Sequence, residues 1–366
     1  MAGSGFGTNF RITTWGETHG AGVGVVVDGC PAGLPLERED VQKYLDRRKP
    51  GQSKYTTQRK EGDQVEILSG IFEGRTTGTP ISMVVYNKDQ RSKDYSNIKD
   101  IYRPGHADFT FDMKYGFRDY RGGGRSSGRE TIGRVAAGAV AAKVLKELGI
   151  EIKAYAKAIA GIEVSKEHFD FAEMNNNPFN MPDKEAAKLV QEKADQMIKE
   201  MDSIGGIIEC QITGMPVGIG ETVFDKLDAE LSKAIMSIGS VKGFEIGDGF
   251  EAANLRGSEN NDDFICVDGK VEKETNHSGG VLGGMSDGST IVFRAAIKPT
   301  PSIAQTQKTV NRVLDNVEIE IHGRHDPMIV PRAVVVVESM AAVTILDGVL
   351  KNLGATMDNI KKIYGE

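Results

Sequence analysis

Three short polar segments place histidine among charged or hydroxyl side chains, the residue types that move protons. They are TWGETHG (14–20), RPGHAD (103–108) and HGRHDP (322–327). Imidazole titrates near pH ~6.5, so His19 and His106, each in a glycine-containing turn, are suited to general acid–base work. Asp326 lies close to an arginine, and a carboxylate beside a guanidinium stays ionised and available as a base. These segments predict proton transfer in a cleft.

The stretch GETHG (16–20) also has the outline of a G-x-S-x-G nucleophile elbow, with Thr18 in place of serine. An elbow requires a strand before the nucleophile and a helix after it. Residues 9–15 have a strand pattern, but residues 22–29 have a second strand pattern instead of a helical one. The prediction is a hairpin-like turn at a cleft, with His19 as a proton-transfer group and no hydrolase elbow.

Positive charge is concentrated in two stretches, although the chain has a net charge of −7. Residues 43–60 hold seven basic residues and one acid, and residues 103–134 hold seven basic residues and four acids. Arginine forks match carboxylates and phosphates, so these clusters predict an anion site. Solvated surface charge is the other interpretation of each cluster alone. The acidic net charge and the few aromatic residues within 43–60 argue against a nucleic-acid partner.

The segment RGGGRSSGRET (121–131) strengthens the prediction of an anion site. Glycines and serines lie among its arginines directly before a helical pattern, and backbone N–H groups at a helix N-terminus favour phosphate. The segment is not a P-loop, because the G-x-x-x-x-G-K-[ST] pattern is absent. A dinucleotide fingerprint that opens a helix after a strand is absent too.

The remaining histidines and the cysteines exclude other classes of site. His322 and His325 suggest a metal, but no cysteine or further histidine stands at metal-ligand spacing, so we expect none. Cys30, Cys210 and Cys266 are odd in number and far apart, which predicts reduced, buried thiols in a cytoplasmic protein. The sequence shows neither a signal peptide nor an apolar run that suits a membrane span, so we expect no membrane partner.

Two pairs of segments resemble each other and recur in the same order. They are VVVDGCPAGLPL (25–36) with CQITGMPVGIGE (210–221), and SGIFEGRTTGTPISMVV (69–85) with GGVLGGMSDGSTIVFRA (279–295). The first member of each half is followed by a helical pattern. Chance similarity between glycine-rich turns is the alternative to duplication, and the shared order weighs against it.

The segments predict one domain over 1–366 made of two duplicated halves, about 1–150 and 205–366, with a helical excursion about 165–204. Further helical patterns cover 130–148, 182–202 and 331–353, and the polar NNNPFNMP (175–182) is predicted to be a surface loop. Regular βαβ alternation is absent, so the predicted fold class is α+β, a layered β-α-β sandwich.

Taken together, the sequence resembles the chorismate synthase family over essentially its whole length. The stretches that carry the resemblance are GETHGAGVGVVVDGCP (16–31), SGRETIGRVAAGAV (127–140) and RHDPMIVPRAVVVVESM (324–340). The resemblance implies a lyase that needs reduced FMN and converts 5-enolpyruvylshikimate 3-phosphate to chorismate and phosphate by an anti 1,4-elimination. It also implies the β-α-β sandwich of the family and a homotetramer.

The resemblance assigns roles to residues of this chain. It implies that His19 protonates the departing phosphate, that His106 balances charge at the flavin N1 edge, and that Asp326 keeps flavin N5 basic. The implied substrate contacts are Arg48, Lys54, Arg103, Arg129 and Arg324. The implied FMN contacts are Arg125, Ser126, Ser127, Gly239, Ser240, Gly284, Lys298, Thr300, Pro301, Ser302 and Arg324.

Some positions depart from the family's usual pattern. Thr18 stands where serine is usual, Lys54 where arginine is usual, and Gly239 and Ser240 lie in a changed flavin segment. The chain shows no extra reductase domain, so an external flavin reductase is expected, with NADPH as an indirect reductant. Two rival functions stay open, a flavin oxidoreductase that transfers hydride in the same pocket and an anion- or RNA-binding module.

Overall fold

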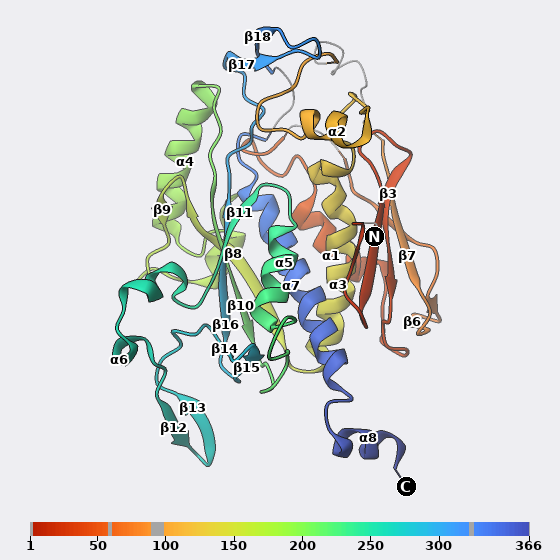
Figure 1. Cartoon of the computed structure of the whole chain (residues 1–366), viewed down its shortest axis with the longest axis vertical. Helices are drawn as coiled ribbons and strands as arrows, with labels where there is room; N and C mark the ends of the chain where they lie inside the picture. The colour runs from red at the N-terminus through yellow and green to blue at the C-terminus, as the bar shows by residue number, and fades with distance from the viewer. Residues whose placement is uncertain (1–2, 58–60, 89–98, 322–325, 366) are drawn as a thin grey trace.

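Two five-stranded antiparallel sheets face each other across a layer of helices (Figure 1). The computed structural model describes residues 3–57, 61–88, 99–321 and 326–365. The first sheet has the order β1 (Gly5–Phe6), β2 (Arg11–Gly16), β3 (Gly22–Asp28), β7 (Ile81–Tyr86), β4 (Val65–Ile67). The second has the order β11 (Val241–Ile246), β16 (Ile291–Ile297), β10 (Gly206–Thr213), β8 (Glu151–Ile159), β9 (Ile162–Glu163). The helices between them are α1 (Arg38–Arg48), α3 (Thr131–Glu147), α5 (Leu227–Met236) and α7 (Val330–Asn352). The predicted α+β sandwich is confirmed.

The two halves have the same topology. In chain order, β2, β3, α1, β4, β7 and α3 correspond to β8, β10, α5, β11, β16 and α7. Even the small hairpins correspond, β5 (Ile71–Phe72) with β6 (Arg75–Thr76) and β14 (Val281–Leu282) with β15 (Met285–Ser286). Because β8 belongs to the second sheet, the second half starts near residue 151 and the excursion interrupts it. Duplication as the origin of this symmetry stays a prediction.

The excursion carries α4 (Lys184–Lys199), whose N-terminal N–H groups are capped by the Asp183 carboxylate. The prediction that 175–182 is a surface loop is wrong, because Phe179 and Met181 are fully buried. Asn177 explains how a polar segment can do this. Its side chain accepts from the backbone N–H groups of Phe179 and Met181 and donates to two carbonyl oxygens, which leaves the apolar side chains free to turn inward.

Shorter helices and hairpins lie at the ends of the sandwich. They are α2 (Asp108–Tyr115), η2 (Gly124–Ser126), η3 (Gly128–Glu130), η4 (Phe171–Asn175), η5 (Gly249–Asn254), α6 (Gly257–Asn260), β12 (Phe264–Val267), β13 (Lys270–Lys273), β17 (Gln307–Val310), β18 (Asn316–Ile319) and α8 (Met357–Tyr364). The β12–β13 hairpin and α8 extend away from the body at the end opposite the β17–β18 hairpin (Figure 1). Cys30 and Cys210 are buried free thiols as predicted, but Cys266 lies on the projecting hairpin and is exposed.

The VVVV segment of the third signature stretch lies within α7, the core helix. Its length and composition would suit a membrane span, but 78% of its most apolar window is buried inside the protein. Val23, Val25 and Val27 of β3 are buried in the same core, and burial alternates in the second half of the strand, where Val26 is half-buried and Asp28 is exposed. The continuous apolar run of α7 follows from burial all round the helix.

Helices α3 and α7 cross very closely, and glycine makes this crossing possible. A Cβ atom placed on Gly138 would lie 2.2 Å from Cβ of Ser339 and 2.5 Å from its Cα. Both of these atoms are rigidly placed, so there is no flexible side-chain end that can move aside. Ala137 and Ala139, on either side of Gly138, are also buried, so small side chains surround α3 at this level.

The Asp347 carboxylate, near the C-terminal end of α7, binds the N-terminal segment of the chain. Asp347 Oδ1 accepts from the backbone N–H groups of Thr8, Asn9 and Phe10 at 3.0, 2.6 and 2.9 Å. The Lys351 ammonium lies 3.0 Å from the other carboxylate oxygen. This clamp joins the first strands of the first half to the last core helix of the second half.

The close crossing gives a stability prediction. Gly138→Ala should lower the free energy of unfolding by about 1–3 kcal/mol, because the added methyl group forces α3 and α7 apart. Gly257→Ala is the control, since Gly257 is also helical but a Cβ there meets no described atom within 4 Å. Urea denaturation of both variants checks this. Equal stability of the two variants would show that the helices can separate without cost.

Candidate functional site

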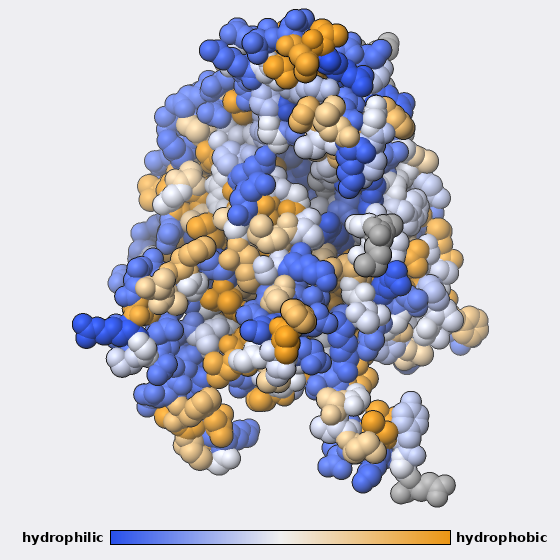
Figure 2. All heavy atoms as spheres, in the orientation of Figure 1, coloured by the Kyte–Doolittle hydropathy of each residue, from blue (hydrophilic) through white to orange (hydrophobic). Residues whose placement is uncertain are grey.

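A cavity of about 600 Å³ opens where loops from both halves meet at the end of the helix layer. Figure 2 shows a hollow edged by hydrophilic side chains on this face, below the hairpin at the top of the view. The first half contributes the glycine-rich segment 123–128 and the start of α3. The second half contributes the segments 237–242 and 298–302 and the start of α7. The volume lies within the ~300–1,000 Å³ of small-molecule sites.

The described lining of this cavity is strongly cationic. Its basic side chains are Arg48, Arg103, Arg125, Arg129, Arg134, Lys242, Lys298 and Arg332, and its carboxylates are Glu61, Glu130 and Asp326. Two further carboxylates outside the lining, Asp63 and Asp108, pair with three of these arginines, and the excess of positive charge that remains favours an anionic ligand. The lining therefore fits the predicted anion site.

His106 is fixed by two hydrogen bonds at the cavity wall. Its Nδ1 lies 3.0 Å from the carbonyl oxygen of Pro104, which can only accept, so Nδ1 carries the proton. Nε2 then accepts from the Ser302 hydroxyl at 2.9 Å. Burial lowers the pKa of His106 below its usual value, and the nearby charge of Arg103 lowers it further. His106 is therefore a neutral imidazole at pH 7.

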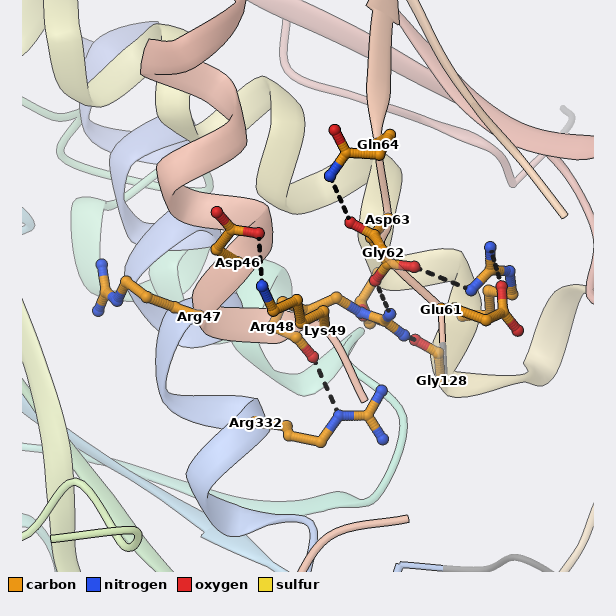
Figure 3. Close-up of polar contacts among 12 residues, drawn as sticks. Asp46, Arg47, Arg48, Lys49, Glu61, Gly62, Asp63, Gln64, Gly128 and Arg332 are labelled. Carbon is orange, nitrogen blue, oxygen red and sulfur yellow. Dashed lines mark hydrogen bonds and ion pairs between the residues drawn. The ribbon is translucent and has the colours of Figure 1, made fainter. Parts of the chain in front are cut away.

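Asp326 lies shortly before the first residue of α7, and two hydrogen-bond donors orient its carboxylate. The backbone N–H of Thr57 donates to Oδ1 at 2.7 Å, and the Arg332 guanidinium donates to Oδ2 at 2.6 Å. Arg332 also donates to the carbonyl oxygen of Arg48 at 3.0 Å (Figure 3). Arg324, the partner predicted from the sequence, lies outside the described residues.

His19 occupies the turn between β2 and β3, as predicted. The turn is closed by the backbone N–H of Gly20, which donates to the carbonyl oxygen of Glu17 at 3.2 Å. Thr18 is buried and lines the cavity, whereas His19 is half-buried and does not belong to the described lining. The structure thus brings the turn to the cavity edge.

Arg48 and Arg129 share one buried carboxylate. Asp63, whose side chain is completely buried, accepts from Arg48 Nη1 at 2.8 Å and from Arg129 Nη1 at 3.1 Å. Arg48 also donates to the carbonyl oxygen of Gly128 at 2.8 Å, and Arg129 lies 2.5 Å from Glu61 (Figure 3). These two arginines are therefore held rigidly, and Asp63 and Glu61 balance their two positive charges.

Arg103 is held in the same manner by Asp108. Its Nε and Nη2 both donate to the Asp108 carboxylate at 2.8 Å, and the pair is buried. Burial opposes ionisation of Asp108, but the Arg103 guanidinium outweighs it and holds the pKa of the carboxyl below its usual value. The pair fixes the guanidinium in the wall and leaves Nη1 outside the bidentate contact.

The glycine-rich segment before α3 positions Arg125, Ser126 and Ser127 at the cavity. Arg125 donates to the carbonyl oxygens of Gly16 and Thr14 at 3.0 and 3.1 Å, which ties the segment to the strand before the His19 turn. Ser127 caps the next turn by accepting from the N–H of Arg129. The described helix start and hydroxyls are those expected of an anion site.

The second half supplies the facing wall. Gly239 and Ser240 lie between α5 and β11, and Ser240 has a φ of 73°, the left-handed region. The N–H of Lys298 donates to the carbonyl oxygen of Ser240 at 2.9 Å, which joins this loop to the segment 298–302. Lys298 Nζ donates to the Gly105 carbonyl oxygen at 3.0 Å and keeps its positive charge beside His106. Thr300, Pro301 and Ser302 complete the wall.

Two predicted contacts lie outside this cavity. Lys54 is exposed and pairs with Asp195 of α4 at 2.8 Å. Gly284 lies in the β14–β15 turn, where its carbonyl oxygen accepts from the N–H of Leu227 at 2.8 Å. Neither belongs to the cavity lining that the structure describes, so their roles stay predictions.

Comparisons with known proteins agree with this geometry. A family model described as chorismate synthase matches residues 10–350. Chorismate synthases of Lachnospira eligens and Agathobacter rectalis are 67% and 65% identical to this chain and match 100% of it, covering 100% and 99% of their own lengths. The chain belongs to the chorismate synthase family. A crystal structure of a chorismate synthase is similar, with a TM-score of 0.77, 31% identity, and coverage of 98% of this chain and 96% of that one.

The activity of the chain is that of a chorismate synthase in the shikimate pathway, a lyase that eliminates phosphate. Enzymes of the chorismate synthase family depend on reduced FMN. The described cavity suits such a cofactor in one more respect. Thr300 Oγ1 is buried at the wall and has no hydrogen-bond partner in the described part of the chain, so it can serve a ligand.

Several residues that line this cavity were missed by the sequence reasoning. Arg134, Lys242 and Arg332 line the cavity but stand outside the residues singled out from the family motifs. Arg134 and Arg332 lie inside the second and third signature stretches, which was a usable signal. Asp63 carries no local motif, because its role depends on two arginines that come from distant parts of the chain.

The shared carboxylate gives a second prediction. Asp63→Asn should lower the free energy of unfolding by about 3–5 kcal/mol, since it leaves two buried guanidinium groups without their common partner. Asp46→Asn is the matched control, because Asp46 forms an exposed pair with Lys49 that contributes about 0–1 kcal/mol. Chemical denaturation measures both. A loss for Asp63→Asn as small as that of the control would contradict the shared-carboxylate role.

The neutral state of His106 gives a third prediction. The unfolded chain takes up a proton at His106 near pH ~6.5, whereas the folded protein does so only at lower pH. Stability should therefore be complete above pH ~6.5 and should fall as the pH decreases through the lower, folded pKa. His106→Gln should flatten this dependence between pH 8 and 5.5, whereas His168→Gln, at an exposed histidine, should not. Urea titrations across that range test it, and identical slopes for His106→Gln and wild type would refute the lowered pKa.

Proposed function

We propose that this cavity performs the elimination of phosphate from 5-enolpyruvylshikimate 3-phosphate with reduced FMN bound in it. One observation carries the proposal. The cationic cavity is lined by residues of all three signature stretches, with Thr18 from the first, Ser127 to Arg134 from the second, and Asp326 to Val336 from the third. A substrate with two carboxylates and a phosphate matches this excess of positive charge.

The arginines bind and orient the substrate in this proposal. Arg48 and Arg129 are held by Asp63, and Arg103 by Asp108, so their remaining N–H groups are fixed before the substrate arrives. Fixed donors lose little conformational entropy when a ligand binds, which favours tight and specific binding. Arg324 and Lys54 are proposed as further substrate contacts on the family motif alone.

Proton handling is assigned to three groups. His19 protonates the departing phosphate at the cavity edge, and a better leaving group lowers the barrier for C–O cleavage. Reduced FMN, held by the residues proposed below, would supply electron-rich chemistry for removal of the hydrogen from carbon. Asp326, oriented by Thr57 and Arg332, is proposed as the carboxylate that would keep flavin N5 basic. His106, a neutral imidazole at pH 7, would take up a proton if the cofactor brought negative charge beside it.

The FMN contacts are proposed on both walls of the cavity. Those that line it are Arg125, Ser126, Ser127, Gly239, Ser240, Lys298, Thr300, Pro301 and Ser302. Gly284 lies elsewhere in this chain, so its contact would require another copy of the chain or would not occur. Arg324 is retained from the motif.

We propose a cytoplasmic homotetramer that receives reduced flavin from an external reductase, with NADPH as the indirect reductant. The exposed apolar side chains of α8 and of the β12–β13 hairpin, among them Ile363, Tyr364, Phe264 and Val271, support subunit contacts. Analytical ultracentrifugation tests the tetramer, and NADPH oxidation by the purified chain tests the need for a reductase.

The deciding experiment is anaerobic. The protein is mixed with chemically reduced FMN and 5-enolpyruvylshikimate 3-phosphate, and phosphate release and chorismate absorbance are followed together. The proposal expects many turnovers per flavin, with the flavin still reduced at the end. Stoichiometric flavin oxidation would favour an oxidoreductase instead, and bound FMN without product would exclude this substrate.

A fourth prediction concerns the general acid. His19→Ala should lower kcat by about 10²–10⁴-fold while FMN still binds, because proton transfer in the transition state contributes that much. His168→Ala, at an exposed histidine remote from the cavity, is the control and should leave kcat unchanged. Steady-state kinetics and quenching of flavin fluorescence separate turnover from binding. Unchanged kcat in His19→Ala would remove His19 from the mechanism.

A further inference from the structure

We propose that Asn87 is a positioning residue for the turn that carries His19, and that it links this turn to Arg129. The inference rests on the role proposed for His19. Asn87 directly follows β7, the strand that pairs with β3. No sequence motif singled it out.

The Asn87 side chain holds the His19 turn by its backbone. Nδ2 lies 2.9 Å from the carbonyl oxygen of Glu17, 3.1 Å from that of Thr18 and 2.8 Å from that of Gly20. The backbone N–H of Asn87 also donates to the carbonyl oxygen of Ala21 at 3.0 Å. One residue therefore contacts the backbone on both sides of His19.

The orientation of this amide is fixed by chemistry. Carbonyl oxygens can only accept, so the side of Asn87 that faces them must be the NH₂ group. On the other side, Oδ1 accepts from Nε of Arg129, and a guanidinium can only donate. A flipped amide would place acceptor against acceptor and donor against donor.

The contacts continue from Asn87 into the arginine pair. Arg129 is bound to Asp63, which also binds Arg48. An anion bound to Arg129 would therefore also act on Asn87, the residue that holds the His19 turn. The structure joins the proposed substrate-binding arginines to the proposed acid through Asn87.

Two other hydrogen bonds of the turn are longer than those made by Asn87. Its own backbone bond, from Gly20 to Glu17, is 3.2 Å long, and the Thr18 hydroxyl donates to the Gly124 carbonyl oxygen at 3.4 Å. Proton transfer is sensitive to placement, and a displacement of about 1 Å can cost about 10²-fold in rate. Loss of the Asn87 amide should thus reduce turnover without removing any group that touches substrate.

Asn87→Asp is the decisive variant. The carboxylate can still accept from Arg129, but it cannot donate to the three carbonyl oxygens and repels them instead. We expect kcat to fall about 10–100-fold, with KM for substrate and the affinity for FMN changed less than threefold. Asn87→Gln, which keeps the amide but lengthens the side chain by one methylene, should act in the same direction with a smaller effect, and it replaces Asn87→Asp if that variant does not fold.

Asn177→Asp is the matched control. Asn177 also braces a turn by donating to two carbonyl oxygens, at 2.6 and 2.8 Å, but it lies before α4 and away from the cavity. This variant should lose stability to a similar extent and keep the wild-type kcat. Equal kcat in Asn87→Asp and Asn177→Asp would overturn the proposal.

Two readouts separate positioning from general stability. In a double-mutant cycle, Asn87→Asp should have no further effect on kcat once His19 is alanine, because the group through which it acts is gone. An equal loss in both backgrounds would exclude action through His19. In the free protein, the NMR titration curve of His19, assigned with His19→Ala, should shift in Asn87→Asp and not in Asn177→Asp, and an unshifted curve would overturn the proposal even if the chain did not convert the proposed substrate.

Discussion

The site depends on one buried carboxylate between two guanidinium groups. Without Asp63, Arg48 and Arg129 would place two positive charges in a poorly solvated wall, and their repulsion would push them toward solvent. With it, both are fixed and partly neutralised before any ligand enters. Arg134 is paired with Glu130, so the remaining positive charge of the cavity is carried in large part by Lys242 and Lys298.

The sandwich is what brings these groups together. Arg48 ends α1, Arg129 precedes α3, and Asp326 precedes α7, so three of the four helices of the central layer present their ends at one opening. The close crossing at Gly138 sets the distance between α3 and α7 and hence between Arg129 and Arg332. Packing that appears purely structural therefore determines the width of the cavity.

Local patterns were enough to predict much of this fold. The alternating valines of β3, the helices near 131–147 and 330–352, and the turn at His19 follow from periodicity and glycine placement. The buried loop at Phe179 did not follow, because its burial depends on Asn177 satisfying the backbone inside the protein. Asp63 and Asn87 could not be predicted for a related reason. Their hydrogen-bond partners, Arg129 for Asp63 and the Thr18 carbonyl oxygen for Asn87, are distant in sequence, and folding brings each pair to 3.1 Å. The positions of Lys54 and Gly284 outside the cavity likewise depend on tertiary placement.

The clamp at Asp347 has a consequence for synthesis of the chain. Its carboxylate binds backbone groups 337 to 339 residues earlier, so the first strands are completed only by the last core helix. During translation the N-terminal sheet and α3, which packs on β3, emerge long before α7, so α3 lacks its partner helix in that interval. Contacts of such long sequence separation slow folding. A truncation before Asp347 would leave the N–H groups of Thr8, Asn9 and Phe10 without this acceptor.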